Sequence, residues 1–155
     1  MKMNSVLAEK VSRNHPPLYS ICHCATIRDV AQYFQRENIG AAMVEKEDPE
    51  PGFYAGIITA KDIIRCIAEI SNLDNVRTSQ IMSQEMLTAD INDDVSSTVR
   101  RMREHHVRHI PLKDNGKIIA LISVRDLMHC IDMEQDKTMS NINEMFGAHR
   151  SDTSF

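Results

Sequence analysis

An internal repeat constrains this chain of 155 residues more than any other feature. Residues 56–67 match residues 120–131 in residue class at nearly every position, at an offset of 64 (120 − 56). Further upstream the offset is 68 (107 − 39), as when Ile39 aligns with Val107. The four extra residues of the first copy fall in an acidic loop at residues 45–52. Each copy has about 60 residues, too few to bury a comfortable core alone, so the copies are expected to pack together.

Apolar periodicity predicts the order strand, helix, strand, strand, helix in each copy, which is an α/β fold. Thr26 is the expected N-cap of the first helix. In the first copy the predicted elements are residues 19–22, 27–38, 39–44, 53–59 and 61–71. In the second they are residues 87–90, 95–106, 107–113, 117–123 and 125–132. The predicted boundaries are 6–71 for the first repeat, 72–132 for the second with its linker, and 133–155 for a separate last helix with a frayed tail from His149.

Composition excludes several classes of protein. Hydrophobic residues make up 42% and charged residues 26%, which is typical of a globular chain. Aromatic residues are only 5% and the net charge is −4, so neither a stacking platform for nucleic acid nor broad binding to DNA or anionic membranes is expected. No apolar run is long enough to span a bilayer, and residues 1–12 lack the apolar stretch of a signal peptide. The expected location is the cytoplasm.

The four cysteines are interpreted as reduced, mostly buried thiols, since no secretion signal is evident. Cys66 and Cys130 are equivalent in the repeat, so both are expected in the core. Alternation along a strand would place Cys22 and Cys24 on one face and His23 on the other. We therefore expect no metal site at this segment. A metal- or redox-responsive role for it remains an alternative.

A small hydroxyl followed three residues later by aspartate occurs once in each copy, directly after a predicted strand: Thr59 with Asp62, and Ser123 with Asp126. We call these the first and second box. The simplest interpretation is a helix N-cap with a carboxylate in the first turn. The same geometry would also suit a nucleotide, because a helix N-terminus attracts phosphate and an ionised aspartate accepts hydrogen bonds from ribose hydroxyls.

With these two boxes in register, the chain resembles a tandem pair of cystathionine-β-synthase (CBS) domains, the arrangement called a Bateman module. The resemblance rests on residues 56–62, 120–126, 107–112 and 80–83, and it covers about residues 6–132. It implies two pseudo-symmetric repeats of the order β-α-β-β-α packed as one module.

The resemblance also implies a regulatory sensor of adenosyl compounds: AMP, ADP, ATP or S-adenosylmethionine. The aspartate of each box would hold ribose and the hydroxyl would contact phosphate. One implied site comprises Thr59 and Asp62 with Ser20 and Ala41; the other comprises Ser123 and Asp126 with Thr88, Arg108, His109 and Pro111. Lys61, Arg108 and Arg125 are the candidates for contacts to phosphate.

The copies depart from one another in ways that make the two sites unequal. The first copy has Gly40 and Ala41 where the second has Arg108 and His109, so the second is locally basic. We therefore favour the second site for an anionic nucleotide. The second copy also has Ala120 where the first has Gly56, which places a side chain where backbone could otherwise approach most closely.

The sequence thus predicts a module that binds and signals without chemistry of its own, because it offers neither an activated nucleophile nor an acid–base pair. With no effector domain evident, the regulated partner would be a separate protein. The alternative from another class is a ligand-free dimerisation or assembly module in which both boxes are only helix caps. A homodimer is expected in either case, through apolar side chains on helices 61–70 and 125–132: Ile64, Ile67, Leu127, Met128 and Ile131.

Overall fold

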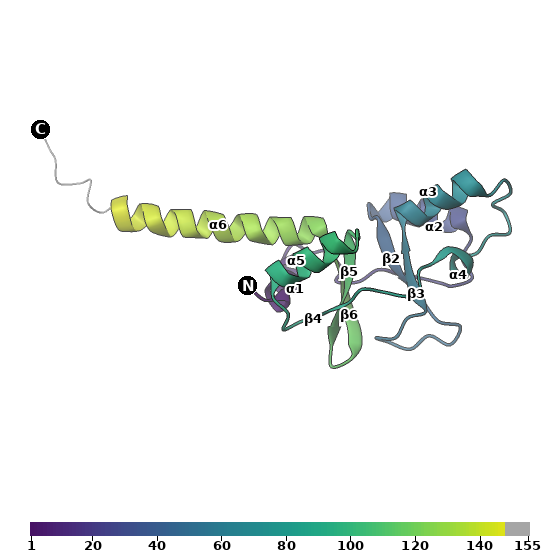
Figure 1. Ribbon diagram of the computed structural model, residues 1–155, viewed down its shortest axis with the longest axis horizontal. Helices are drawn as coiled ribbons and strands as arrows, with labels where there is room; N and C mark the ends of the chain where they lie inside the picture. The colour runs from purple at the N-terminus through teal and green to yellow at the C-terminus, as the bar shows by residue number, and fades with distance from the viewer. Residues whose placement is uncertain (148–155) are drawn as a thin grey trace, which may run out of the picture.

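The computed structural model describes residues 1–147, and it shows one half of the molecule for each copy of the repeat (Figure 1). The first copy runs β1 (Ser20–Ile21), α2 (Ile27–Glu37), β2 (Ala41–Val44), β3 (Gly56–Thr59) and α3 (Ala60–Glu69). Its sheet has the order β1-β2-β3, with β1 parallel and β3 antiparallel to β2. Thr26 caps α2 through a reciprocal bond with Asp29, as the sequence predicts.

The second copy repeats this topology. It runs β4 (Ala89–Asp90), α5 (Val95–Glu104), β5 (His109–Asp114), β6 (Lys117–Ser123) and α6 (Val124–Gly147), and its sheet has the order β4-β5-β6 with the same strand directions. The α/β class and the repeated β-α-β-β-α order are therefore confirmed. Most strands and helices are one to three residues shorter than predicted, and in the first sheet β1 pairs over two residues and β2 and β3 over four.

One helix, not two, forms the C-terminal part of the described chain. The prediction of a separate last helix after residue 132 is wrong, since α6 continues unbroken to Gly147 and projects away from the body (Figure 1). Exposed polar side chains occupy the middle of this helix, so the apolar spacing is interrupted there although no glycine or proline stops the backbone. The expected frayed tail at residues 149–155 lies outside the described residues.

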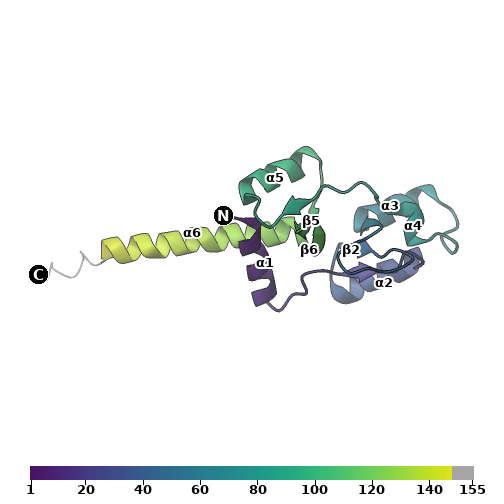
Figure 2. The same cartoon turned by 90° about the horizontal axis from the view of Figure 1, so that it is seen from below.

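Two short helices have no counterpart in the predicted elements. α1 (Met3–Ser12) packs against the second copy, beside the beginning of α6 (Figure 2). Its Met3 and Val6 are fully buried in the core of that copy. α4 (Thr78–Ile81) lies in the segment between the copies and buries Thr78.

The segments that lead into each copy cross over to the sheet of the other. Ser83, ahead of β4, exchanges two backbone hydrogen bonds with Ile57 of β3, at 3.0 and 2.9 Å. Pro17, ahead of β1, accepts a bond of 2.9 Å from the amide of Leu121 in β6. The segment ahead of β4 thus extends the first sheet at β3, and the segment ahead of β1 extends the second sheet at β6.

A third apolar cluster joins the two copies into one body. It combines Ala41, Met43 and Ile57 of the first sheet with Ile118 and Leu121 of the second. The crossed segments and this shared cluster fix the two boxes relative to one another, which is what places a hollow between the copies.

The cysteines divide into two kinds. Cys66 and Cys130 are buried free thiols, as expected from their equivalence in the repeat. Cys22 and Cys24, by contrast, form a disulfide with a Cα–Cα distance of 5.2 Å, so the prediction of two reduced, buried thiols is wrong for this pair. The strand ends at Ile21 and residues 22–24 form a turn, so the alternation assumed for them does not apply and Cys24 is exposed.

Candidate nucleotide site between the two repeats

Both boxes form helix caps with nearly the same geometry. In the first box the amide and hydroxyl of Thr59 donate to Asp62 Oδ2 at 2.8 and 3.0 Å, and the Asp62 amide donates to Thr59 Oγ1 at 3.4 Å. In the second box the amide and hydroxyl of Ser123 donate to Asp126 Oδ2 at 2.9 and 2.8 Å. The cap interpretation is therefore correct for both boxes. It leaves Oδ1 of each aspartate as the oxygen open to other partners.

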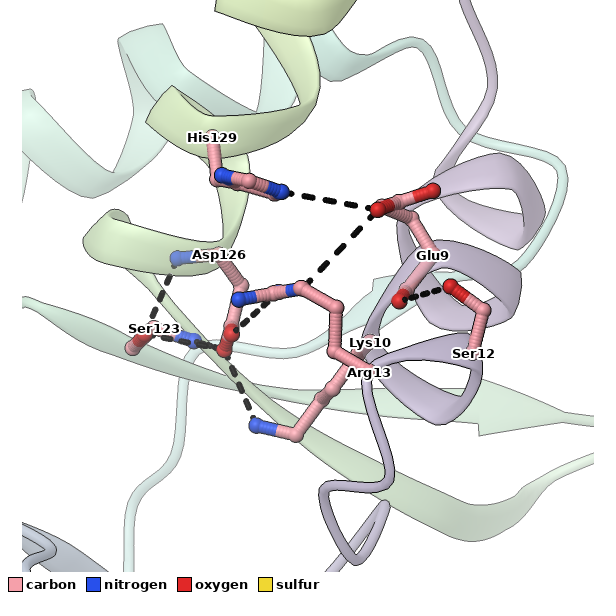
Figure 3. A network of polar contacts seen from close by, with 7 residues as sticks. All are labelled: Glu9, Lys10, Ser12, Arg13, Ser123, Asp126 and His129. Carbon is pink, nitrogen blue, oxygen red and sulfur yellow. Dashed lines mark hydrogen bonds and ion pairs between the residues drawn. The ribbon is translucent and has the colours of Figure 1, made fainter.

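The surroundings of Oδ1 differ between the copies. Among the described residues 1–147, Asp62 Oδ1 has only Arg65 Nη1 at 3.8 Å, and the Arg65 side chain is 58% exposed. Asp126 Oδ1 instead accepts from Arg13 Nη2 at 3.3 Å, and its Oδ2 also accepts from Lys10 Nζ at 2.9 Å. Lys10 lies in the last turn of α1 and Arg13 is the C-cap residue of that helix, which the predicted elements do not contain (Figure 3).

The first box lines a hollow of about 210 Å³ between the copies. Thr59, Lys61 and Asp62 contribute from the first copy, and His109 and Pro111 from the middle strand of the second. Apolar and polar side chains together complete its lining: Ile57, Arg65, Ser83, Glu85, Met86, Leu87, His106 and Val107. A wall of this kind can take a flat apolar ring beside a carboxylate, with Lys61 and Arg65 available to an anionic group.

This hollow joins residues that the resemblance assigns to separate sites. His109 pairs with Ser123 across β5 and β6, so its backbone belongs to the second box, but its side chain lines the hollow of the first. Its ring lies 3.6 Å from the position of a Cβ on Gly40, which puts it at the seam between the copies. Burial lowers the pKa of His109, helped by the charges of Lys10 and Arg108 and opposed by Asp126.

The remaining predicted site residues lie outside the lining of this hollow. Ala41 pairs directly with Thr59 but is buried in the shared cluster, and Ser20 donates its hydroxyl to Glu45 at 2.8 Å. The carbonyl of Thr88 accepts from Arg101 at 2.6 Å. Arg108 and Arg125 are both exposed.

Several residues near the two boxes were not identified from the sequence. Lys10 and Arg13 carry no motif, and α1 has only two buried positions, so nothing in the sequence connects them to Asp126. Arg65 does carry a signal, because it follows Asp62 by three positions on the same helix face.

Two further findings concern metal-binding clusters and membrane-spanning helices in the described residues. In residues 1–147 no group of three or more His, Cys, Asp or Glu side chains is placed to hold a metal ion. Over the same residues, no helix combines the length and apolar character needed to cross a membrane.

The CBS domain family model matches the chain twice, at residues 17–69 and 78–132. The chain belongs to the CBS domain family. These two stretches contain both boxes and all strands of both sheets. The resemblance stated from the sequence is thereby confirmed, and the structure is that of a CBS pair.

Solved structures of other CBS proteins share this architecture. A putative signal-transduction protein from Burkholderia ambifaria is 25% identical with a TM-score of 0.77, covering 87% of this chain and 96% of that one. A CBS domain protein from Pyrobaculum aerophilum, solved in complex with AMP, is 26% identical with a TM-score of 0.68, covering 81% and 89%.

Curated relatives are longer than the matched region. A homoserine O-acetyltransferase from Methanococcus vannielii is 29% identical over 132 residues, which is 83% of this chain but 26% of that enzyme. The chain likewise spans about half of an uncharacterized protein from Methanopyrus kandleri, 52% of its length, at 30% identity. The CBS pair therefore corresponds to only a part of these relatives.

Proposed function

We propose that this CBS pair is a regulatory module that binds an adenosine nucleotide in the hollow at Asp62 and signals to a separate partner protein. The observation that carries the proposal is the meeting of Thr59 and Asp62 with His109 and Pro111 in one hollow. Within the part of the chain that the structure describes, Asp62 Oδ1 has no ion-pair partner closer than Arg65 at 3.8 Å, so it can accept a ribose hydroxyl. The AMP complex of the Pyrobaculum aerophilum relative supports this choice of ligand class.

The charges around the hollow support an anionic ligand. Lys61 and Arg65 stand on the first turns of α3, where the amides of the helix N-terminus also favour a phosphate. Glu85 lies on the same lining and opposes high negative charge, which favours a monophosphate over a triphosphate. The preference argued from sequence was for the second box, because Arg108 and His109 make the second copy locally basic. The contacts of Lys10 and Arg13 with Asp126 shift our proposal to the first.

Because the hollow is shared by both repeats, a ligand there would bind one relative arrangement of the repeats more tightly than another. Binding would then shift the population toward that arrangement. No catalytic group is part of the proposal: the module would act by binding alone. Location in the cytoplasm remains a prediction, as does the separate effector protein.

The test is the thermal stability of three proteins with and without AMP: wild type, Asp62→Asn and the matched control Asp126→Asn. At about 100 times its Kd, AMP should add about 2.7 kcal/mol to wild type. That corresponds to a rise of about 5–11 °C in Tm for a chain of this size. Asp62→Asn should lose most of the rise, whereas Asp126→Asn should keep it.

Two outcomes would contradict the proposal. No rise in wild type with millimolar AMP would remove it, and would favour the assembly module. For that second candidate the motivating observation is a row of exposed apolar side chains on two helices, with Ile64 67%, Ile67 57% and Met128 55% exposed. A rise that only Asp126→Asn abolishes would place the ligand at the second box instead.

A further inference from the structure

The second box is occupied by the chain itself. Figure 3 shows Lys10 and Arg13 reaching from α1 to the two oxygens of Asp126. Lys10 Nζ lies 2.9 Å from Oδ2 and Arg13 Nη2 lies 3.3 Å from Oδ1. The Lys10 and Asp126 side chains are only 12% and 10% exposed, so this ion pair is largely withdrawn from water.

These contacts use the acceptor capacity that a ribose would need. A carboxylate offers about two acceptor positions on each oxygen. Oδ2 of Asp126 already accepts from the Ser123 amide, the Ser123 hydroxyl and Lys10, and Oδ1 accepts from Arg13. A pair of vicinal hydroxyls can therefore reach Asp126 only if the cations of α1 give way.

The first box shows what the same motif looks like without such a contact. The cation nearest to Asp62 is Arg65 of its own helix, 3.8 Å away and mostly exposed. Both aspartates are buried to a similar degree, at 8% and 7% exposure. The difference between the boxes thus comes from α1 and not from the motif.

α1 is attached firmly at its beginning and more lightly at its end. In its first turn the amides of Met3 and Asn4 donate hydrogen bonds to the carbonyl oxygens of Asp93 and Ile91. The Val6 side chain is fully buried. Its last residues and the following turn are mostly exposed: Val11, Ser12, Asn14 and His15.

One of the two cations at this end, Arg13, is not fully hydrogen-bonded. The buried Arg13 Nε has no hydrogen-bond partner among residues 1–147 and lies 3.9 Å from Glu9 Oε1. Glu9 also lies 3.4 Å from His129 Nε2 of α6. Displacing the end of α1 would therefore break two contacts to Asp126 and loosen one to α6, while the anchored first turn stays in place.

We propose that the end of α1 is an autoinhibitory plug of the second box, in which Lys10 and Arg13 take the place of a ribose at Asp126. The inference rests on the proposed function at Asp62 and adds that this CBS pair holds one nucleotide per chain. The second box becomes available to a nucleotide only when the end of α1 moves away.

Two measurements on the full chain test the plug. The first is hydrogen exchange without any ligand, comparing wild type with Asp126→Asn, which keeps an oxygen for the Ser123 cap but removes the charge. Amides at residues 10–15 should exchange about tenfold faster in Asp126→Asn. The matched control Asp62→Asn should leave these amides unchanged.

The second measurement counts bound AMP by calorimetry in wild type and in Lys10→Met/Arg13→Gln. Wild type should bind one AMP per chain and the double variant two. Unchanged exchange in Asp126→Asn would overturn the proposal, as would two AMP in wild type or one in a folded double variant. If neither protein binds AMP, the proposed function fails at Asp62. The exchange result then decides alone whether Asp126 holds α1.

Discussion

Replacement of Gly56 by alanine tests the crossed segment that extends the first sheet. A Cβ on Gly56 would lie 2.5 Å from the backbone oxygen of Ser83 and 3.0 Å from the sulfur of Met82. The Met82 side chain can move, but the Ser83 carbonyl is held by its bond of 3.0 Å from the Ile57 amide. The new methyl group must therefore push the linker off β3.

The expected cost follows from these contacts. Overpacking against fixed backbone costs about 1–3 kcal/mol, and weakening the two Ile57–Ser83 bonds adds about 0.5–1.5 kcal/mol each. Allowing for partial relaxation, we expect Gly56→Ala to lower the free energy of unfolding by about 2–4 kcal/mol. This is a fall of about 4–16 °C in Tm for a chain of this size.

Gly40→Ala is the matched control, because its Cβ would meet only the His109 ring at an ordinary 3.6 Å. At such a position alanine should be neutral or should stabilise by up to about 1 kcal/mol, through the unfolded state. Urea unfolding of the two variants beside wild type measures the difference. Equal stability of Gly56→Ala and Gly40→Ala would refute the close approach of the linker to β3.

Three further predictions concern other parts of the molecule. Burial holds the pKa of His109 below its usual 6.5, so the unfolded chain binds more protons than the folded one at acidic pH. The contribution of His109 to the free energy of unfolding should therefore be fully present above about pH 6.5 and decrease as the pH falls below it. His109→Gln should flatten this dependence in urea titrations at pH 5–8. Replacing Cys22 and Cys24 by serine opens a loop of only three residues, so it should cost no more than about 1.5 kcal/mol by the same assay; a loss above 3 kcal/mol would contradict this. Light scattering should give a homodimer near twice 17.6 kDa, and Ile64→Lys/Ile67→Lys should give a monomer, whereas a monomeric wild type would exclude this interface.

The repeat made most of the fold predictable from sequence. The apolar pattern of a single short strand is a weak signal, and the alignment of two copies strengthens it. The aligned boxes also mark where the last helix of each copy begins. The expected apolar faces were correct for Ile64, Ile67 and Met128, which are exposed. They were wrong for Leu127, which is 1% exposed in the core of the second copy, and for Ile131, which is partly buried against the same core. A helix of two apolar faces cannot be oriented from its own sequence, because the side that is buried depends on what packs against it.

The candidate site was harder to predict, since its parts meet through packing between the copies. Thr59 and Asp62 were identified from local spacing, which a cap and a nucleotide site share. The presence of His109 beside them depends on how the two sheets face one another, and that of Lys10 beside Asp126 depends on α1. Both contacts join residues far apart in sequence, with no motif to signal the pairing.

The crossed segments also impose an order on folding while the chain is being synthesised. Ser83 follows Ile57 by 26 positions (83 − 57), so the edge of the first sheet can be completed soon after its last strand leaves the ribosome. Pro17 pairs with Leu121, which is made 104 positions later (121 − 17). At about 5–20 residues per second, the segment ahead of β1 waits about 5–20 s for its partner strand. During that interval the first repeat has no second repeat to pack against, and the slow, long-range closure of the module waits for its last strand, β6.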